Sequence, residues 1–185
     1  MWNTPNLLTL LRIGLIPVFV VVFYAQAPWA RPVAAAIFAV AAITDWLDGH
    51  LARRWEQTSP LGAFLDPVAD KFLVCAALLI LLQLDRVNAL VAFIIIGREI
   101  AISALREWMA QIGASRSVAV SMLGKLKTVV QMVAIPFLLF DGALFGVIDT
   151  RLWGTALIYI ASFLTIWSMV YYMRKAMPEI RAKVR

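Results

Sequence analysis

The sequence predicts an all-α integral membrane protein with six transmembrane helices and both termini in the cytoplasm. Of its 185 residues, 63% are hydrophobic and only 15% are charged, whereas roughly 25% are charged in an average soluble domain. The mean hydropathy is +0.85. A helix needs about 20 apolar residues to cross a hydrocarbon core, so the chain has room for about six crossings with short connections. We therefore expect a single transmembrane domain over residues 1–185.

The expected spans follow the apolar runs, which are separated by short polar or charged stretches. They cover residues 7–24, 30–53, 61–83, 88–109, 118–140 and 152–173. In the first span, Thr9 and Arg12 lie one turn apart. An arginine inside a span should face a cavity or a partner, because its charge is costly against lipid.

Four carboxylates lie at the junction of the second and third spans. If the second span begins near Ala30 on the outer side, a rise of 1.5 Å per residue places Asp45 about 22 Å down a core roughly 30 Å thick. Asp48 follows one turn later, and Asp66 and Asp70 should lie at a similar depth on the returning helix. Each acid costs up to about 3 kcal/mol on insertion scales, so positive charge must compensate.

Two interpretations of the acids are open on these residues. The adjacent basic residues Arg53, Arg54 and Lys71 could form salt bridges with them. Alternatively, the acids could bind a hard divalent cation such as Mg²⁺ or Mn²⁺, which prefers oxygen ligands and commonly shares substrate phosphates. Gly49 and Ala52 fall on the same helical face as the first acid, which would leave a shallow groove open to a diphosphate.

The fourth and fifth spans carry a second charged group. Glu99 and Arg106 share a helical face, and Arg98 lies about 80° from Arg106. With Lys125 and Lys127, near the start of the fifth span, they could form a basic pocket for a phosphate group. The alternative is that the basic residues mark the cytoplasmic boundary while Arg98 and Glu99 form a structural ion pair.

The sixth span is followed by the basic stretch "RKAMPEIRAKVR", which together with the other basic residues predicts the topology. Basic residues gather on the cytoplasmic side of membrane proteins. One side would hold Arg53, Arg54, Arg106, Arg116, Lys125, Lys127, Arg174, Lys175, Arg181, Lys183 and Arg185, and the other only Arg31, Arg86 and Arg151. This distribution is typical of topology signals and attraction to anionic lipid rather than of nucleic-acid binding.

The acids also fit a known signature. The spacing Asp45-x2-Asp48-Gly49-x2-Ala52-Arg53-x8-Gly62-x3-Asp66-x3-Asp70 resembles that of the CDP-alcohol phosphatidyltransferase family, with every position filled. The stretches "TPNLLTLLR", "GREIAISALREWMA" and "VAVSMLGKLKT" resemble the bacterial members of that family that use a glycerol phosphate acceptor.

This resemblance implies an enzyme that transfers a phosphatidyl group from CDP-diacylglycerol to sn-glycerol 3-phosphate and releases CMP. It implies two ions, Mg²⁺ or Mn²⁺, held by Asp45, Asp48, Asp66 and Asp70, with Asp70 also acting as the base. The CDP-lipid would contact Asn6, Thr9, Arg12, Gly49, Ala52, Arg53 and Gly62, and the acceptor phosphate Arg98, Arg106, Lys125 and Lys127. It further implies a homodimer in the bacterial inner membrane, with the active site facing the cytoplasm.

Other functions remain as alternatives. Within the family, serine, an inositol phosphate or another lipid could replace the acceptor. Intramembrane prenyltransferases also pair aspartates with Mg²⁺, but they are expected to have more spans and two separate Asp-rich motifs. A divalent-cation transporter should have further acids along its path, whereas the outer halves of these spans contain no matching acids.

Overall fold

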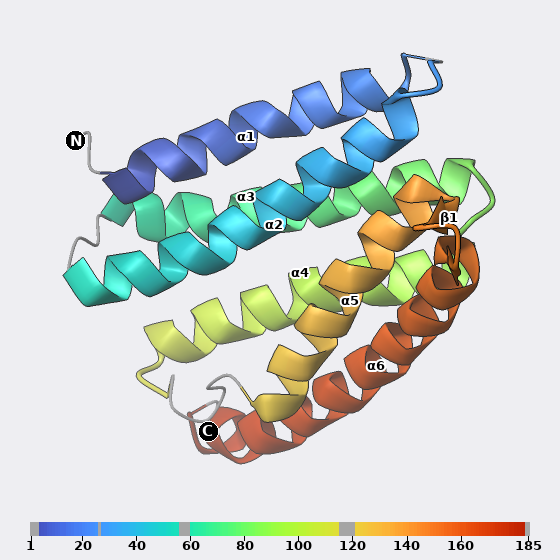
Figure 1. Cartoon of the computed structure of the whole chain (residues 1–185). Helices are drawn as coiled ribbons and strands as arrows, with labels where there is room; N and C mark the ends of the chain where they lie inside the picture. Colours follow the sequence, from blue (N-terminus) through green and yellow to red (C-terminus); the bar gives the residue numbers. More distant parts are fainter. Residues whose placement is uncertain (1–3, 26, 56–59, 115–120, 184–185) are drawn as a thin grey trace.

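The computed structural model describes residues 4–25, 27–55, 60–114 and 121–183. Over these residues the chain forms six α-helices and one short hairpin (Figure 1). The helices are α1 (Thr4–Phe23), α2 (Ala30–Trp55), α3 (Pro60–Gln83), α4 (Ala89–Gln111), α5 (Met122–Phe140) and α6 (Thr150–Lys183). Between α5 and α6, β1 (Ala143–Leu144) pairs antiparallel with β2 (Ile148–Asp149).

The prediction of an all-helical fold is confirmed, and the main differences lie at the C-terminal half of the chain. The last helix was expected to end at residue 173, but α6 continues to Lys183, so most of the basic tail is helical. α5 begins later than predicted because Ser121 caps it, its side chain accepting a hydrogen bond from the Gly124 N–H. The short hairpin replaces a predicted loop.

Two of the described helices meet a simple length and hydropathy test for crossing a membrane. These are the segments Met122–Phe140 and Thr150–Arg181. Within the described residues, α1 and α2 contain shorter apolar stretches, Thr9–Phe23 and Ala30–Thr44. Membrane character is therefore consistent with the fold, while the crossing of all six helices stays a prediction.

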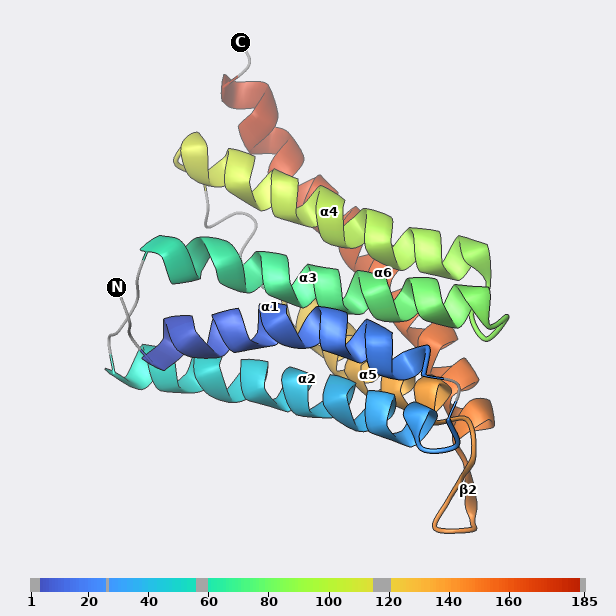
Figure 2. The same ribbon diagram turned by 90° about the horizontal axis from the view of Figure 1, so that it is seen from above.

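The helices alternate in direction, which gathers particular helix ends at one end of the bundle. Figures 1 and 2 show the starts of α1 and α3 beside the end of α2, with the ends of α4 and α6 on the same side of the molecule. α1 packs against both α2 and α3, while α5 packs against α2 and α6. We call this end, where α2 ends and α3 begins, the acidic end, because all four predicted acids belong to it.

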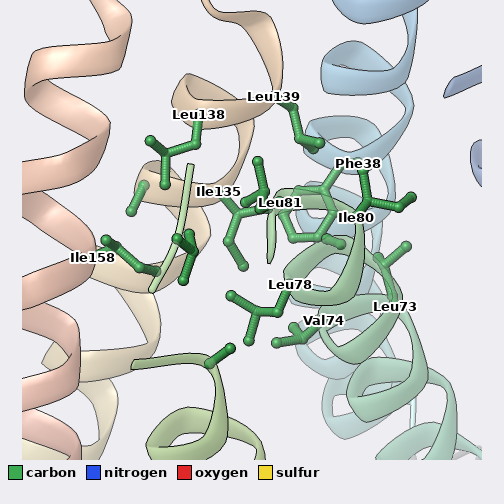
Figure 3. Close-up of a cluster of buried hydrophobic side chains, with 14 of the residues drawn as sticks. Phe38, Leu73, Val74, Leu78, Ile80, Leu81, Ile135, Leu138, Leu139 and Ile158 are labelled. Atoms are coloured by element: carbon green, nitrogen blue, oxygen red, sulfur yellow. The ribbon is translucent and has the colours of Figure 1, made fainter. Parts of the chain in front are cut away.

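The main core contains aliphatic and aromatic side chains from all six described helices (Figure 3). Phe38, Leu78, Leu81 and Leu138 are fully buried in it. α6 approaches α5 closely at Gly154, because a Cβ placed there would lie only 2.8 Å from the Leu138 Cγ. Small residues at such crossings permit the close van der Waals packing on which helix association in lipid depends.

The end of the bundle opposite the acidic end is closed by Arg86, in the connection between α3 and α4. Its guanidinium donates to the backbone carbonyls of Leu138 (2.7 Å) and Leu139 (3.2 Å) and to the Asp141 carboxylate (2.5 Å). Asp141 terminates α5 in a left-handed conformation with φ of 51°. Arg86 therefore satisfies carbonyls that the helix leaves unpaired at its C-terminus and complements the negative end of its dipole.

Burial and the nearby carboxylate act on Arg86 in opposite directions. Burial lowers the pKa of Arg86, and the charge of Asp141 raises it again. Arg31, from the start of α2, lies 3.4 Å from the same carboxylate but is largely exposed. The three charges thus tie α2, α5 and the α3–α4 connection together, with Arg86 as the buried partner.

We expect Arg86→Met to destabilise the fold by about 3 kcal/mol, because it leaves a carboxylate and two carbonyls without their buried donor. The measurement is the apparent melting temperature of the purified protein in detergent. Arg31→Met is the matched control, since it removes an exposed partner of the same carboxylate and should lower the melting temperature only slightly. Equal effects of the two substitutions would contradict the assigned role of Arg86.

Candidate active site

The predicted acids lie on two helices that are connected at the acidic end. Asp45 and Asp48 belong to the last turns of α2, and Asp66 and Asp70 belong to the first turns of α3. Of these four, only the side chain of Asp70 is among the described side chains. The contacts of the other three, and those of Asn6, Gly49, Ala52, Arg53 and Gly62, lie outside what the structure describes.

Asp70 forms an ion pair with Arg12, which joins α1 to α3. The Arg12 Nη1 donates to the Asp70 Oδ1 at 3.1 Å. Arg12 is only 2% exposed, and Thr9, one turn earlier on α1, is equally buried. The expectation that an arginine inside the first span would face a partner is therefore confirmed, and the partner is one of the predicted metal ligands.

The chemistry of the predicted donor set suits a hard divalent cation. All four predicted ligands are carboxylates, and hard cations such as Mg²⁺ and Mn²⁺ prefer oxygen donors. Within the described side chains, no group of three or more acidic, histidine or cysteine residues could hold a metal ion. Three of the four predicted ligands fall outside that set, so the metal site stays a prediction.

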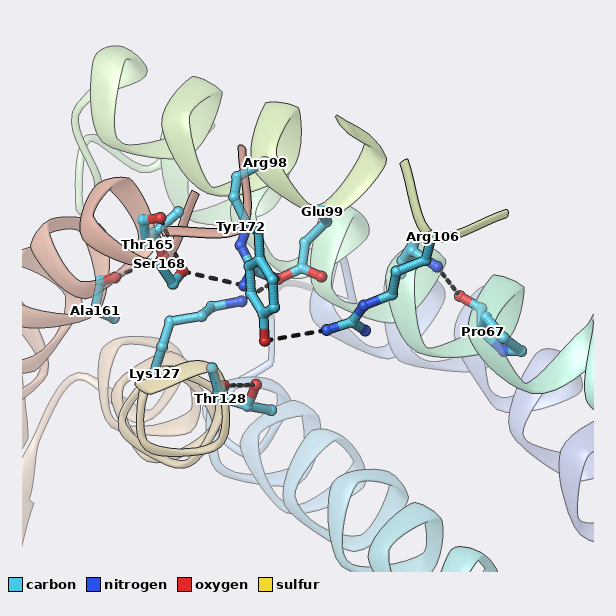
Figure 4. Close-up of polar contacts among 12 residues, drawn as sticks. Pro67, Arg98, Glu99, Arg106, Lys127, Thr128, Ala161, Thr165, Ser168 and Tyr172 are labelled. Carbon is cyan, nitrogen blue, oxygen red and sulfur yellow. Dashed lines mark hydrogen bonds and ion pairs between the residues drawn. The ribbon is translucent and has the colours of Figure 1, made fainter. Parts of the chain in front are cut away.

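A second charged cluster lies between α4 and α5 (Figure 4). Lys127 of α5 is 1% exposed and forms an ion pair and hydrogen bond with Glu99 of α4. Arg98 lies 3.7 Å from the same carboxylate, so the Arg98–Glu99 ion pair of the alternative interpretation is present. The burial of Lys127 argues against a role as a mere boundary marker, because such residues extend their charge to the membrane surface.

Tyr172 of α6 links the two arginines of this cluster to the start of α5 (Figure 4). Its hydroxyl accepts hydrogen bonds from Arg106 (3.3 Å) and from the Ser121 backbone N–H (2.7 Å). The Arg98 and Arg106 guanidinium carbons lie 5.8 and 5.3 Å from its ring centroid. These distances permit cation–π attraction, which gains strength where water is excluded.

Tyr172 is a member of this cluster that was not predicted. An aromatic residue near a span end is typical of a membrane-interface anchor, but Tyr172 is fully buried. A signal was present in the helical pattern: Thr165, Ser168 and Tyr172 recur on one face of α6, and all three are fully buried. Ser168 also accepts a hydrogen bond from Arg98 at 3.1 Å. A polar stripe on an otherwise apolar span indicates a face turned toward the protein interior.

A cavity of about 700 Å³ lies between α3, α4 and α5, and both Asp70 and the charged cluster of α4 and α5 line it. Asp70 and Lys71 line it on α3, and the charged residues that line it on α4 are Arg98, Glu99, Arg106 and Glu107. Lys127, Thr128 and Gln131 complete its wall on α5. The structure thus places the predicted base and three of the four predicted phosphate-binding residues around one space. A larger groove of about 890 Å³ on α6 is lined by apolar side chains and two arginines.

Lys125 is the predicted phosphate-binding residue that the structure leaves outside this cavity. It is exposed, and it is not among the residues that line the space. Two residues along a helix correspond to a rotation of about 200°, so Lys125 and Lys127 lie on opposite faces of α5. The two lysines were predicted to act together because both lie near the start of the fifth span, but they point to different sides of the helix.

Comparison with known proteins identifies the family. The model of the CDP-alcohol phosphatidyltransferase family matches residues 2–167. The chain belongs to this family. It is 50% identical over 185 residues to the CDP-diacylglycerol–glycerol-3-phosphate 3-phosphatidyltransferase of Salmonella paratyphi A, covering 97% of each chain. It is 49% identical, with the same coverage, to the protein of that name from Escherichia coli K12.

We expect Tyr172→Phe to lower the stability of the bundle by about 1–3 kcal/mol. The substitution keeps the ring beside both arginines but removes the hydroxyl that bonds Arg106 and the Ser121 N–H, leaving two half-buried donors without this acceptor. The apparent melting temperature in detergent is the readout. Tyr171→Phe, at the neighbouring position where the ring lies beside Lys175, provides the control. A melting temperature as high as that of the parent protein would show that the hydroxyl does not hold α6 to α5.

Proposed function

We propose that the chain transfers the phosphatidyl group of CDP-diacylglycerol to sn-glycerol 3-phosphate, yielding phosphatidylglycerophosphate and CMP. The observation that carries this proposal is the cavity in which the acid Asp70 faces three buried or half-buried cationic side chains. Relatives about 50% identical over nearly the whole chain bear the name of this reaction. The family match extends over both the acids and the cavity.

The acids in the last turns of α2 and the first turns of α3 would bind the donor diphosphate through divalent cations. Asp45, Asp48, Asp66 and Asp70 supply the carboxylate ligands for two ions, Mg²⁺ or Mn²⁺. Such ions neutralise the charge of the diphosphate and align attacking and leaving oxygens for an in-line displacement. Gly49, Ala52 and Gly62 lack bulky side chains on this face, so the nucleotide could approach the helix backbone closely.

The chain's own side chains would manage the proton and the phosphate charges. Asp70 accepts the proton of the attacking hydroxyl, the new bond forms between that oxygen and the lipid-bearing phosphorus, and CMP leaves with the electrons of the broken bond. Arg12, which contacts Asp70, holds the carboxylate in place and contributes, with Asn6, Thr9 and Arg53, to binding the diphosphate.

The charges around the cavity favour an anionic acceptor. Its lining carries three carboxylates and four cations, which leaves a formal excess of one positive charge. The carboxylates are Asp70, Glu99 and Glu107, and the cations are Lys71, Arg98, Arg106 and Lys127. A phosphate group bound there would receive charge-assisted hydrogen bonds in a space from which the helices exclude much of the water. A neutral alcohol would leave this positive excess uncompensated, which favours glycerol 3-phosphate over an uncharged acceptor.

The setting we propose is the bacterial inner membrane, crossed by all six helices, with the active site and both termini on the cytoplasmic side. The apolar character of α5 and α6 supports membrane insertion. The acidic end carries most of the basic residues, whereas Arg31 and Arg86 meet at the opposite end. A homodimer is the assembly expected from the family resemblance.

Purified protein given CDP-diacylglycerol should release CMP only when a divalent cation and glycerol 3-phosphate are both present. Chelation should abolish release, and added Mg²⁺ or Mn²⁺ should restore it, because four clustered carboxylates cannot otherwise accommodate a diphosphate. A panel of acceptors containing serine, inositol phosphate and glycerol identifies the alcohol. CMP release that persists after chelation would exclude the role of the metal. CMP release with a different acceptor, and none with glycerol 3-phosphate, would exclude the proposed substrate.

Removing one guanidinium of the cavity should weaken binding of the acceptor more than that of the donor. We expect Arg106→Gln to raise the KM for glycerol 3-phosphate about tenfold to a hundredfold, the loss typical of one charge-assisted hydrogen bond. The KM for CDP-diacylglycerol should change little. Lys125→Gln removes a charge from the exposed face of α5 and should leave both constants near those of the parent. If the two variants behaved alike, general surface charge rather than the cavity would govern acceptor binding.

A further inference from the structure

Gln131 presents a buried polar atom to the cavity that no part of the described structure satisfies. The residue is 2% exposed and lines the cavity, one helical turn after Lys127. Among the described residues, its Oε1 has no hydrogen-bond partner. A buried carbonyl left unpaired costs about 1–3 kcal/mol, whereas an apolar side chain of the same size would avoid this cost.

The position of Gln131 on α5 separates the charged part of the helix face from its apolar part. Lys127 precedes it by four residues and also lines the cavity, while Ile135 and Leu138 follow it on the same face and are fully buried in the core. Gln131 is therefore the last polar residue on this face before the core begins. Gln131 therefore lines the same space as the cations and lies next to the apolar core.

We propose that the Gln131 Oε1 accepts a hydrogen bond from the hydroxyl of the acceptor that does not attack, and so makes the enzyme selective for a vicinal diol phosphate. This inference rests on the proposed function, which places the phosphate at Arg98, Arg106 and Lys127. Side chains at i and i+4 on a helix are about 5–6 Å apart, comparable to the length of a three-carbon phosphate ester. A ligand whose phosphate meets Lys127 can thus reach Gln131 with the hydroxyl on its middle carbon.

This hydrogen bond would determine which acceptor the enzyme uses, and not only how tightly an acceptor binds. A site that hydrogen-bonds a substrate hydroxyl discriminates against an analogue without it, because the analogue leaves the buried protein group unpaired. Phosphate recognition by the three cations cannot make this distinction, since the analogue carries the same phosphate. Gln131 would therefore determine specificity, while the catalytic carboxylate and the cations act on both compounds alike.

The test compares two acceptors, glycerol 3-phosphate and 3-hydroxypropyl phosphate, which lacks only the middle hydroxyl. In detergent, the parent protein should favour glycerol 3-phosphate by about tenfold to a hundredfold in kcat/KM, the range for one buried neutral hydrogen bond. Gln131→Met keeps the length of the side chain but lacks the carbonyl. It should bring the ratio close to one, mainly by raising the KM for glycerol 3-phosphate.

Two further variants make the result decisive. Gln131→Glu retains an accepting oxygen, so it should keep the preference for the diol even though its charge weakens binding of both phosphates. Thr128→Ala removes a hydroxyl of the same cavity wall that already bonds the Gly124 carbonyl at 2.9 Å, so it should leave the ratio unchanged.

Distinct outcomes separate this inference from the proposed function. If the parent protein used both acceptors equally well, or if Gln131→Met slowed both by the same factor, Gln131 would have no role in selecting the acceptor. If the parent protein released no CMP with either compound but did so with another alcohol, the proposed function itself would fail.

Discussion

The pairing of buried charges between different helices is the constraint on which this bundle depends. An unpaired charge in a low-dielectric interior is far more costly than a typical helix contact can offset. Arg12 of α1 meets Asp70 of α3, and Lys127 of α5 meets Glu99 of α4. The first pair joins two helices that are not consecutive in the chain, and the second joins two successive helices. In both cases a shift of one helix along its neighbour would separate the charges. The ion pairs thereby specify the register that the apolar core alone would leave less well defined.

The two ends of the bundle use their charges differently. At the end closed by Arg86, the guanidinium meets helix carbonyls and the carboxylate of Asp141, so positive and negative groups are balanced. Around the cavity, four cations face three carboxylates, and the Tyr172 ring and hydroxyl contact two of the cations, Arg98 and Arg106. Such an excess of oriented donors is what a preorganised site for an anion requires. Structural stability is sufficient to explain the first arrangement, whereas the excess of positive charge in the second also favours binding of an anion.

The apolar runs predicted the helices well because lipid and protein core both demand long segments without charge, and most boundaries agree within a few residues. The depth of the basic residues on α4 and α5 also anticipated that Arg98, Arg106 and Lys127 would surround one space. Tyr172 was not predicted, since an aromatic residue near a span end also suits a membrane interface, although its helical spacing from Thr165 and Ser168 carried a signal. The extension of α6 was missed because a charged tail can be helical without being apolar.

The buried pair of Lys127 and Glu99 helps to fix the helix register, but stability alone does not require these two residues to be charged. Apolar residues of similar volume often replace a buried ion pair without loss of stability, and some such replacements stabilise the protein. The same reasoning applies to Gln131, where an apolar side chain would spare the fold an unpaired carbonyl. The polar side chains of the cavity lower the stability of the protein without a ligand, but they would bind an anion that also carries a hydroxyl group. The cavity wall on α5 therefore has the composition expected of a binding surface, although it is built on the face that elsewhere packs the core.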